Sequence, residues 1–484
     1  MLVRWPWLSF LIVVAGVSCV MPAVTRAADA PASKSPAALP PAALPPDLGT
    51  RTGGEDWPCF LGPTGDSKSS ERGILTTWPR QGPPVVWQHR LGTGYGMPSI
   101  SRGRLFQFSR FGGQARLECL KSETGEPLWK FEYPTEYEDL YGYDNGPRCS
   151  PVIDGDRVYI FGAEGMLHCL RAVDGEPVWK IDTQEKFGVV QNFFGVGSTP
   201  VIFRDLLVCQ IGGSTDATRN TPPGQLDRVR GNGSDVVAFD KLTGAVRYQT
   251  SDELASYAGP TLATIGDRPW CFVFARGGLL GFNPTDGKID FHFPWRATIL
   301  ESVNASNPVV VDDLVLISET YGPGGAVLKV KPGGYDVVWS DKDRRRDKHL
   351  QTHWNTPVHV DGYVYASSGR HSENAEMRCV ELRTGKVMWS QPGLARSSLL
   401  YADGHFLLLS EGGDLVLVKV NPEKFEPLAI TEQDPPANDP LAARQAPRKL
   451  LTYPAWAAPI LSHGLLYVRD HNRLVCLELI AEKK

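Results

Sequence analysis

The sequence predicts an all-β fold: an eight-bladed β-propeller of four-stranded antiparallel blades, closed by an N-terminal strand in the last blade. Two observations lead to this prediction. A unit of about 40 to 60 residues recurs along the chain, which is the size of a propeller blade. The composition is also typical of short strands and tight turns, with 49 glycines, 39 prolines and 13 tryptophans among 484 residues.

The N-terminus has the pattern of an export signal. Arg4 supplies a positive charge, the stretch from Trp7 to Val20 is apolar, and small residues flank Arg26. We therefore expect a signal peptide over residues 1–27, cleaved after Ala27. Two alternatives stay open, because Cys19 ends a GVSC segment that could be a lipoprotein site and the apolar stretch could remain uncut as an anchor.

Three domains follow from the composition: the signal peptide, an Ala/Pro-rich linker over 28–56, and the propeller over 57–484. The net charge of −4 does not indicate a nucleic-acid-binding protein. No segment after the signal is apolar enough to span a membrane. We expect a monomer in the periplasm or cell envelope, free or anchored.

The segment SPVIDGDRVYIFGAEGMLHCLRAVDGEPVWK, residues 150–180, shows the repeat unit. A small residue followed by proline opens the first strand, and Asp154-Gly155 makes a turn. The next two strands follow, and Asp174-Gly175 turns into a last strand that ends near Trp179. This order predicts a four-stranded antiparallel meander.

The same order recurs from Met97-Pro98 onward, and the eighth unit stops near Ile480 without a fourth strand. The missing strand precedes the first unit, as Pro84-Val85-Val86-Trp87. We therefore expect this strand to complete the last blade, since closing the ring removes exposed strand edges.

Two residue types repeat at fixed places in the blades. Tryptophans at the blade ends are expected to pack between neighbouring blades, namely Trp87, Trp129, Trp179, Trp339 and Trp389. Cysteines at one equivalent position are expected to form a buried layer, namely Cys119, Cys169, Cys379 and Cys476. Cys59 and Cys149 lie outside this layer and are the candidates for a disulfide, if one forms.

Six segments carry a specific resemblance: GYDNGPRCSP, FGAEGMLHCL, VVQNFFGVGSTP, QTHWNTPVHVDG, NPEKFE and YPAWAAPILSHGLLYVR. They resemble the propeller repeats of quinoprotein (PQQ) dehydrogenases and BamB-like proteins, in a form abundant in planctomycete bacteria. The resemblance spans residues 57 to 479 and implies an eight-bladed ring. In the dehydrogenases this ring holds PQQ and Ca²⁺ over the channel; in BamB-like proteins it is a binding platform.

The sequence departs from the dehydrogenases in its cysteines. They carry adjacent cysteines beside the cofactor, whereas no two of the nine cysteines here are adjacent, and a CxxCH haem motif is absent. Their calcium ligands and catalytic aspartate have no counterpart that we can place. The sequence therefore assigns neither PQQ nor Ca²⁺ nor any catalytic residue.

Loops that precede the first strand of each blade should converge at the mouth of the channel. We predict a ligand site there, suited to a flat ligand with anionic or hydroxyl groups. Its candidate residues are Tyr95, Arg148, Asn192, Phe194, Tyr257, Asn304, His353, Trp354, Arg396 and Trp456. The alternative is that these side chains plug the channel and bind backbone.

Three further features favour structural roles. His349 and His353 have metal-ligand spacing but follow a charged loop and lack a third ligand, so no metal site is predicted. The tyrosine-rich stretch 133–144 is expected to pack between blades rather than bind sugars. The insert 213–235 is a surface excursion that could be a lid, a partner contact or a mobile loop.

Two functions are consistent with these features. The favoured one is a non-catalytic exported propeller that binds an envelope protein or small ligand at the channel mouth. The alternative is a PQQ- and Ca²⁺-dependent dehydrogenase that oxidises an alcohol or sugar. No Walker, Rossmann, HExxH or nucleophile-elbow motif points to another reaction.

Overall fold

The repeats fold into eight sheets in the computed structural model, which describes residues 43–431 and 450–482. All of these residues belong to one compact unit, Leu39–Lys484. The Asp-Gly and Thr-Gly turns form because glycine accepts the left-handed conformation, as at Gly175 with φ of 76°. The expected signal peptide, with its lipoprotein and anchor alternatives, lies outside the described residues.

The blades are numbered in chain order, and the strands of each are as follows. Blade 1 contains β3 (Ser99–Ser101), β4 (Arg104–Phe111), β5 (Gln114–Lys121) and β6 (Pro127–Pro134); blade 2 contains β7 (Val152–Asp154), β8 (Arg157–Phe161), β9 (Met166–Arg171) and β10 (Pro177–Asp182); blade 3 contains β11 (Val201–Phe203), β12 (Leu206–Gln210), β13 (Val236–Asp240) and β14 (Val246–Thr250); blade 4 contains β15 (Thr261–Ile265), β16 (Arg268–Phe274), β17 (Gly278–Phe282) and β18 (Ile289–Pro294).

Blades 5 to 8 continue the series. Blade 5 contains β19 (Val309–Val311), β20 (Leu314–Glu319), β21 (Gly324–Lys331) and β22 (Gly334–Ser340); blade 6 contains β23 (Val358–Val360), β24 (Tyr363–Ser368), β25 (Glu376–Glu381) and β26 (Val387–Pro392); blade 7 contains β27 (Ser397–Ala402), β28 (His405–Ser410), β29 (Leu415–Lys419), β30 (Glu426–Ile430) and β1 (Lys68–Ser69); blade 8 contains β31 (Ile460–Ser462), β32 (Leu465–Arg469), β33 (Arg473–Glu478) and β2 (Val85–Arg90). The described helices are short: α1 (Thr183–Phe187), η1 (Leu226–Arg228) and η2 (Ser372–Asn374).

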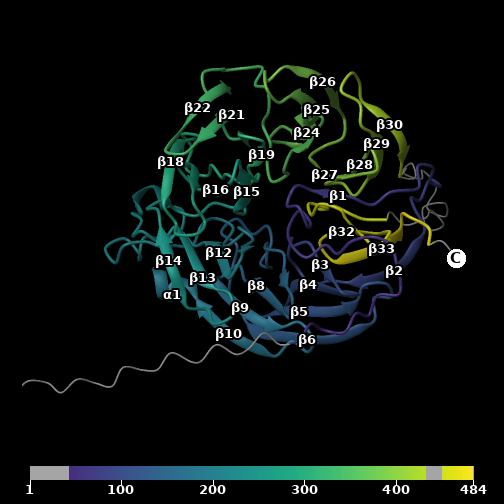
Figure 1. Ribbon diagram of the computed structural model, residues 1–484, viewed down its shortest axis with the longest axis horizontal. Coiled ribbons are helices and arrows are strands. Elements are labelled where there is room, and N and C mark those ends of the chain that lie inside the picture. The colour runs from purple at the N-terminus through teal and green to yellow at the C-terminus, as the bar shows by residue number, and fades with distance from the viewer. Residues whose placement is uncertain (1–42, 432–449, 483–484) are drawn as a thin grey trace, which may run out of the picture. The chain divides into compact units, whose positions relative to one another are not determined.

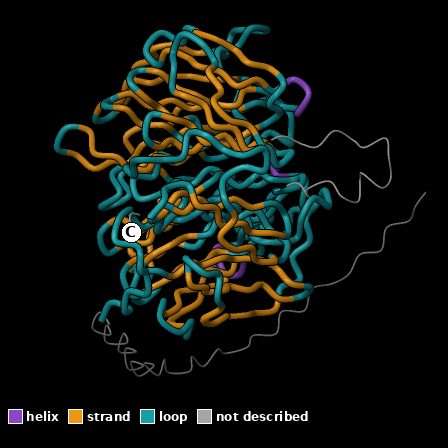
Figure 2. The backbone as a smooth tube through the Cα atoms, turned by 90° about the vertical axis from the view of Figure 1, so that its right-hand side faces the viewer, coloured by secondary structure: helices purple, strands orange, loops and turns teal. Residues whose placement is uncertain are grey.

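The blades are arranged in a ring around a common centre (Figure 1). The first strands lie near the centre, where β3 neighbours β7 and β23 neighbours β27, and the last strands lie at the rim. Figure 2 shows how strands and their connecting loops make up nearly all of the described chain. Hydrophobic clusters lie between adjacent blades, as where Phe106 of blade 1 packs with Val158 of blade 2.

The N-terminal strand closes the ring, as the sequence predicts. β2 pairs antiparallel with β33, placing Trp87 opposite Cys476, and β33 continues into β32 and β31. The amide of Glu478 also donates to the carbonyl of Pro84 at 2.8 Å. Blade 8 therefore takes its outer strand from the start of the propeller and its other three from the end.

The repeated cysteines are small because two aromatic rings flank each of them. In blade 1, Cys119 lies opposite Trp129 on one neighbouring strand and opposite Phe106 on the other, and the two rings are 5.8 Å apart. Blades 2, 6 and 8 repeat this arrangement with tyrosine in place of phenylalanine. The predicted cysteine layer is buried, and all eight described cysteines are free thiols, including Cys59 and Cys149.

Each blade-end ring then packs on the turn of the next blade. A β-bulge directly before Trp87 turns the indole toward blade 1, where it covers Gly125 and donates to the carbonyl of Ser122 at 3.0 Å. Trp179 and Trp339 make the same bond to their following blades, at 3.2 and 2.8 Å. The predicted wedge role of these rings is confirmed, and at Gly125 a Cβ atom would lie 2.8 Å from the indole.

A segment ahead of the first blade crosses the channel; we call residues 57–69 the plug. Trp57 exchanges backbone hydrogen bonds with Ile100 of blade 1, and the carbonyl of Pro58 accepts from Ile153 of blade 2 at 2.8 Å. The plug ends in β1, which pairs parallel with β27 of blade 7 (Figure 1). It thereby bridges blades on different sides of the channel.

Ordered contacts begin ahead of residue 57, where the sequence places the end of the linker. The guanidinium of Arg51 binds Glu478 at 2.9 Å, and Thr50 donates its amide to Glu123 at 2.7 Å. Arg102 donates to the carbonyl of Pro45 at 2.6 Å. The last part of the predicted linker is thus fastened to blades 1 and 8.

Candidate functional site

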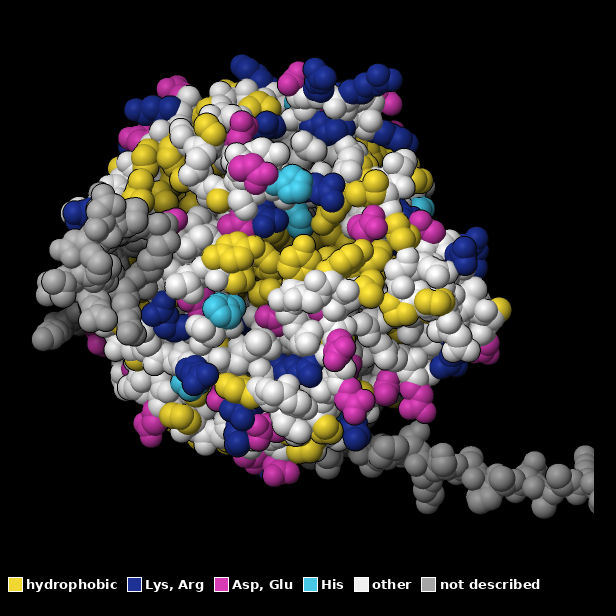
Figure 3. Space-filling view, turned by 180° about the vertical axis from the view of Figure 1, so that it is seen from behind, with side chains coloured by type: hydrophobic (Ala, Val, Ile, Leu, Met, Phe, Trp, Pro, Cys, Tyr) yellow, Lys and Arg dark blue, Asp and Glu magenta, His cyan; other side chains and the backbone are white. Residues whose placement is uncertain are grey.

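The loops before the first strands converge on a cavity of about 400 Å³ at one mouth of the channel. We call it the mouth cavity. The structure brings eight of the ten sequence-predicted residues into its lining: Tyr95, Arg148, Phe194, Tyr257, His353, Trp354, Arg396 and Trp456. Figure 3 shows one face of the unit with hydrophobic side chains gathered at its centre, beside histidine and basic side chains.

Asn192 and Asn304 do not line this cavity. The amide of Asn192 donates to the carbonyl of Ala255 at 3.0 Å and faces a small void between blades. Asn304 is fully buried and donates to the carbonyls of Ala275 and Trp295. Both amides satisfy backbone groups that have no strand partner, which is why a polar residue stands at these loop positions.

Arg396 is held by a buried carboxylate at the wall of the mouth cavity. Its Nε and Nη2 bind the two oxygens of Glu411 at 3.0 and 2.6 Å, and its guanidinium lies 4.5 Å from the ring centre of Trp354. Glu411 also accepts from the indole of Trp456 at 3.0 Å. Burial raises the pKa of Glu411, but the bonds from Arg396, Ser372 and Trp456 outweigh it and lower that pKa, so the carboxylate is charged.

Arg148 is fixed in a similar way on the other side of blade 1. Its Nη2 binds the buried carboxylate of Asp139, and its two terminal nitrogens donate to the carbonyls of Gly146 and Asp144. The guanidinium lies 5.7 Å from the ring centre of Tyr95. Each predicted arginine therefore has its charge balanced inside the protein.

Aromatic rings make up most of the remaining wall. Trp456 is central to one group, with ring centres 4.8 Å from Tyr95, 5.1 Å from Trp354 and 6.0 Å from Tyr453. A second group joins Phe194 to Tyr257 at 5.5 Å and to Tyr143 at 6.0 Å. These tilted and edge-on contacts hold the rings against one another.

His353 lies between the aromatic and polar parts of the wall. Its Nε2 is 3.3 Å from the hydroxyl of Tyr321, and its buried Nδ1 has no hydrogen-bond partner. Burial, with Arg396 and Arg370 nearby, lowers the pKa of His353 to about 3. The imidazole is therefore neutral near pH 7.

Phe60 and Leu61 of the plug are among the residues that line the mouth cavity. A second cavity of about 210 Å³ is lined by plug residues and the first strands of blades 2 to 4. Phe60 lines both cavities, so the plug contributes to each of them.

The insert 213–235 supports the wall. Leu226 and Val229, from the insert 213–235, pack with Phe193 beneath the rings of Phe194 and Tyr257. The insert is fastened by Asp227, which binds Arg296 at 2.7 Å and Arg276 at 3.1 Å. The structure thus shows the insert as a packed support of the cavity wall.

The tyrosine-rich stretch has two roles. Tyr133 and Tyr137 are buried, as the packing prediction requires, and Tyr133 donates to Glu164 at 2.7 Å. Tyr141 and Tyr143 are instead 47% and 64% exposed. Tyr143 lines the mouth cavity, so this half of the stretch forms part of the site.

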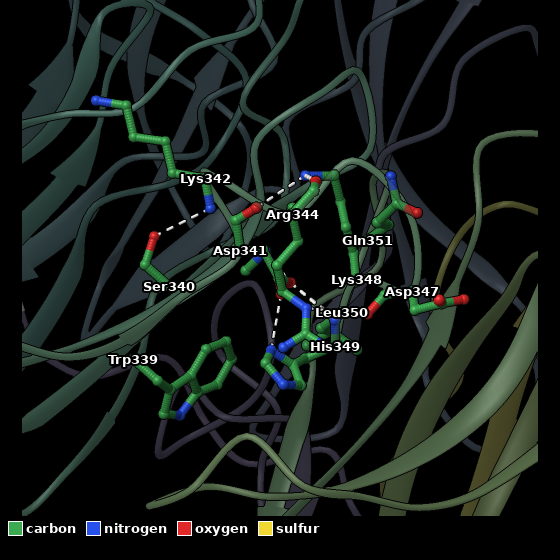
Figure 4. Close-up of polar contacts among 12 residues, drawn as sticks. Trp339, Ser340, Asp341, Lys342, Arg344, Asp347, Lys348, His349, Leu350 and Gln351 are labelled. Atoms are coloured by element: carbon green, nitrogen blue, oxygen red, sulfur yellow. Dashed lines mark hydrogen bonds and ion pairs between the residues drawn. The ribbon is translucent and has the colours of Figure 1, made fainter.

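His353 lines the mouth cavity, whereas His349 belongs to a separate group of polar contacts around Asp341, shown in Figure 4. The buried carboxylate of Asp341 binds Nδ1 of His349 at 2.7 Å and accepts from the amides of His349 and Gly325. His349 also packs edge-on against Trp339. In residues 43–431 and 450–482, no group of three or more histidine, cysteine or acidic side chains could hold a metal ion.

A comparison with known protein families shows which family this chain belongs to. Residues 139–391, more than half of the chain, match the family described as outer membrane protein assembly factor BamB. The chain belongs to this family. Within the described residues of this BamB-family propeller, no helix is long and apolar enough to cross a membrane.

Solved structures show the same fold at low sequence identity. BamB from Moraxella catarrhalis aligns with a TM-score of 0.53 and 12% identity over 83% of this chain and 98% of that chain. Quinohemoprotein alcohol dehydrogenase from Comamonas testosteroni aligns with a TM-score of 0.60 and 12% identity over 89% and 81%. A computationally designed protein, Ika8, aligns at 0.50 and 8% identity over 82% and 100%. A comparison with curated protein sequences gave no match.

Sequence reasoning missed the acidic partners of the arginines. Glu411 follows the second strand of blade 7, and Glu319 and Asp470 hold the equivalent position in blades 5 and 8. Aligning the repeats at this position would have drawn attention to the three acids. Asp139 sits in an irregular loop, and no repeat pattern points to it.

Proposed function

We propose that this BamB-family propeller is a non-catalytic binding protein of the cell envelope, and that a polypeptide partner places an aromatic anchor in the mouth cavity. The observation that carries the proposal is the composition of the site: tryptophan, tyrosine and arginine line one pocket. These residue types are enriched in the binding hot spots of protein interfaces. The expected export signal and the family description support the location.

The rim supports a partner larger than a small molecule. Tyr143 and Tyr453 line the mouth cavity and are 64% and 57% exposed. Tyr141, whose ring centre is 5.8 Å from that of the lining residue Phe194, is 47% exposed. Exposed apolar groups gathered at one place favour an interaction surface. Inside the cavity, Arg148 and Arg396 are already paired with acids, which favours an apolar or aromatic anchor over the doubly anionic ligand that two free arginines would attract.

The alternative function is a PQQ-dependent dehydrogenase. The oxygen atoms available as Ca²⁺ ligands at this site give it less support. Ca²⁺ takes about six to eight oxygen ligands. Two buried carboxylates beside the mouth cavity, Glu411 and Asp139, are bound by arginines, and Glu319 accepts from the amide of Tyr321. The residues at this mouth therefore do not fit a PQQ–Ca²⁺ pair, and we propose no step through that cofactor.

Blocked tripeptides test the proposal. We expect N-acetyl-Gly-Trp-Gly-amide to bind with a Kd of about 1 mM, and N-acetyl-Gly-Gly-Gly-amide not to bind, in ligand-observed NMR. Tyr143→Ser and Trp456→Ala should each weaken binding at least about fivefold, because each removes a ring from the wall. Leu428→Ser, at a residue of β30 with 44% exposure, is the control and should leave binding unchanged.

Equal binding of both tripeptides, or unchanged affinity in both cavity variants, would contradict the proposal. The dehydrogenase is tested separately by adding PQQ with Ca²⁺ and an alcohol or aldose with a redox dye. A cation-dependent rise in Tm together with dye reduction would overturn the non-catalytic assignment.

A further inference from the structure

Arg370 differs from the other two arginines at the mouth cavity. It follows β24, its side chain is exposed, and its guanidinium lies 4.6 Å from the ring centre of Tyr321, which lines the cavity. Among the described residues, no carboxylate lies within ion-pair distance of it, whereas Arg148 and Arg396 each have one. This positive charge beside the cavity therefore lies against an aromatic ring but has no carboxylate partner.

The loop that carries Arg370 is held in place. Nη1 of Arg396 donates to the carbonyl of Arg370 at 3.3 Å, and the hydroxyl of Ser372 donates to Glu411 at 2.5 Å. The amide of Gly369 donates to the carbonyl of Gln351 at 2.8 Å. The guanidinium thus projects from backbone that the buried Arg396–Glu411 pair itself fixes, so its position is defined before any ligand arrives.

The hydroxyl of Tyr321 adds a donor beside this charge. Burial raises the pKa of Tyr321 to about 12 although Arg370 opposes the rise, so the phenol keeps its proton. The phenol of Tyr143 also lines the mouth cavity. An arginine with neighbouring hydroxyl donors is well suited to a carboxylate.

The size of the mouth cavity limits how a chain can enter. Its volume of about 400 Å³ is near the lower end of the range for ligand pockets, about 300–1,000 Å³, and Phe60 and Leu61 of the plug take up part of its wall. An internal aromatic residue would have to bring two chain segments to the mouth, whereas a chain end brings one.

We propose that the occupant of the mouth cavity is the free C-terminus of a polypeptide whose last residue is aromatic. The ring enters among Trp354, Trp456 and Tyr95, and the terminal carboxylate binds Arg370 at the edge. This inference rests on the proposed binding function and adds the chemical identity of the bound segment.

Matched peptides test it in the full chain. N-acetyl-Gly-Gly-Trp with a free carboxylate should bind about fivefold more tightly than the same peptide ending in an amide, a difference expected for one rim-exposed ion pair. Arg370→Gln should bring this ratio close to one. Arg383→Gln is the control, because Arg383 is exposed in the same blade and pairs with Asp312 at 3.7 Å, and it should keep the wild-type ratio.

Four other results of these peptide measurements would contradict the inference. Equal binding of acid and amide would overturn it while leaving the aromatic anchor of the proposed function intact. Equal binding of N-acetyl-Gly-Trp-Glu-Gly-amide and the free acid would assign the carboxylate to an internal acidic side chain instead. No binding of any tryptophan peptide would overturn both proposals. A preference for the free acid that persists in Arg370→Gln would show that another group binds the carboxylate.

Discussion

Arg396 and Glu411 form a two-point ion pair that also organises the backbone around it. The carboxylate is 3% exposed, accepts two bonds from the guanidinium, and takes a third from the indole of Trp456. The pair therefore links the wall of the mouth cavity to the loop that carries Arg370. Its energetics follow from its burial, since a buried charge that loses its partner is far more costly than an exposed one.

Glu411→Ala should lower the free energy of unfolding by about 3–5 kcal/mol, because it leaves the guanidinium of Arg396 in the wall without a counter-charge. The double variant Arg396→Leu with Glu411→Leu should cost less than the single one. Urea unfolding measures both. Asp205→Ala, which breaks an exposed pair with Arg247, is the control and should cost under about 1 kcal/mol. A Glu411→Ala cost no larger than this control would contradict the assignment.

Gly125→Ala should destabilise the propeller more than Gly112→Ala. Both glycines are in blade 1 with positive φ, 71° and 58°, so both substitutions strain the backbone by about 1 kcal/mol. At Gly125 the new Cβ would also lie 2.8 Å from the Trp87 ring, whereas at Gly112 nothing lies within 4 Å. The difference in Tm between the two variants isolates the contact that seals blade 8 to blade 1. Equal Tm values would show that the indole gives way freely.

Trp57→Ala should release the plug. Trp57 is fully buried, and removing a buried tryptophan side chain costs about 3–5 kcal/mol. Hydrogen exchange should then speed up at the amides of Ile153 and Tyr401, which donate to Pro58 and Ser67 of the plug. Amides within β21 should stay protected as an internal control. Uniform acceleration at all these sites would mean that the plug and the blades unfold together.

His353 should make stability sensitive to acid. Its pKa is about 3 in the folded state and about 6.5 when unfolded, so the unfolded chain binds more protons between these values. Stability is therefore complete above pH 6.5 and falls as the pH drops below it, by up to about 1.4 kcal/mol per pH unit. The variant His353→Gln should show a shallower loss between pH 6.5 and 5 in urea unfolding.

His463 provides a control of opposite sign. Its bond to Asp56 raises its pKa despite partial burial, so its contribution is present below pH 6.5 and is lost as the pH rises through the folded value. His463→Gln should therefore steepen the acid loss of stability. If His353→Gln leaves the pH profile unchanged, the imidazole of His353 is solvated rather than buried.

The repeat pattern was sufficient to predict the blades, the closing strand and the ring-on-turn packing, because each depends on residues close in sequence. The same logic placed eight residues at the mouth cavity, since loop position follows from blade order. It was wrong in placing Asn192 and Asn304 there, because an amide in a loop can serve the backbone as well as a ligand. Nothing in the repeats marks the plug, whose contacts with Ile153 and Tyr401 join distant parts of the chain.

The composite last blade also constrains how the protein is made. Val85 pairs with Leu477, so a strand produced early on the ribosome finds its neighbour only after the intervening blades have been made. Until then the blades lack circular closure, and the unpaired edges of β2 and the final blade are open to association with other chains. The nascent polypeptide must therefore be shielded until β33 has emerged, and loss of β33 alone would leave β2 without its partner strand.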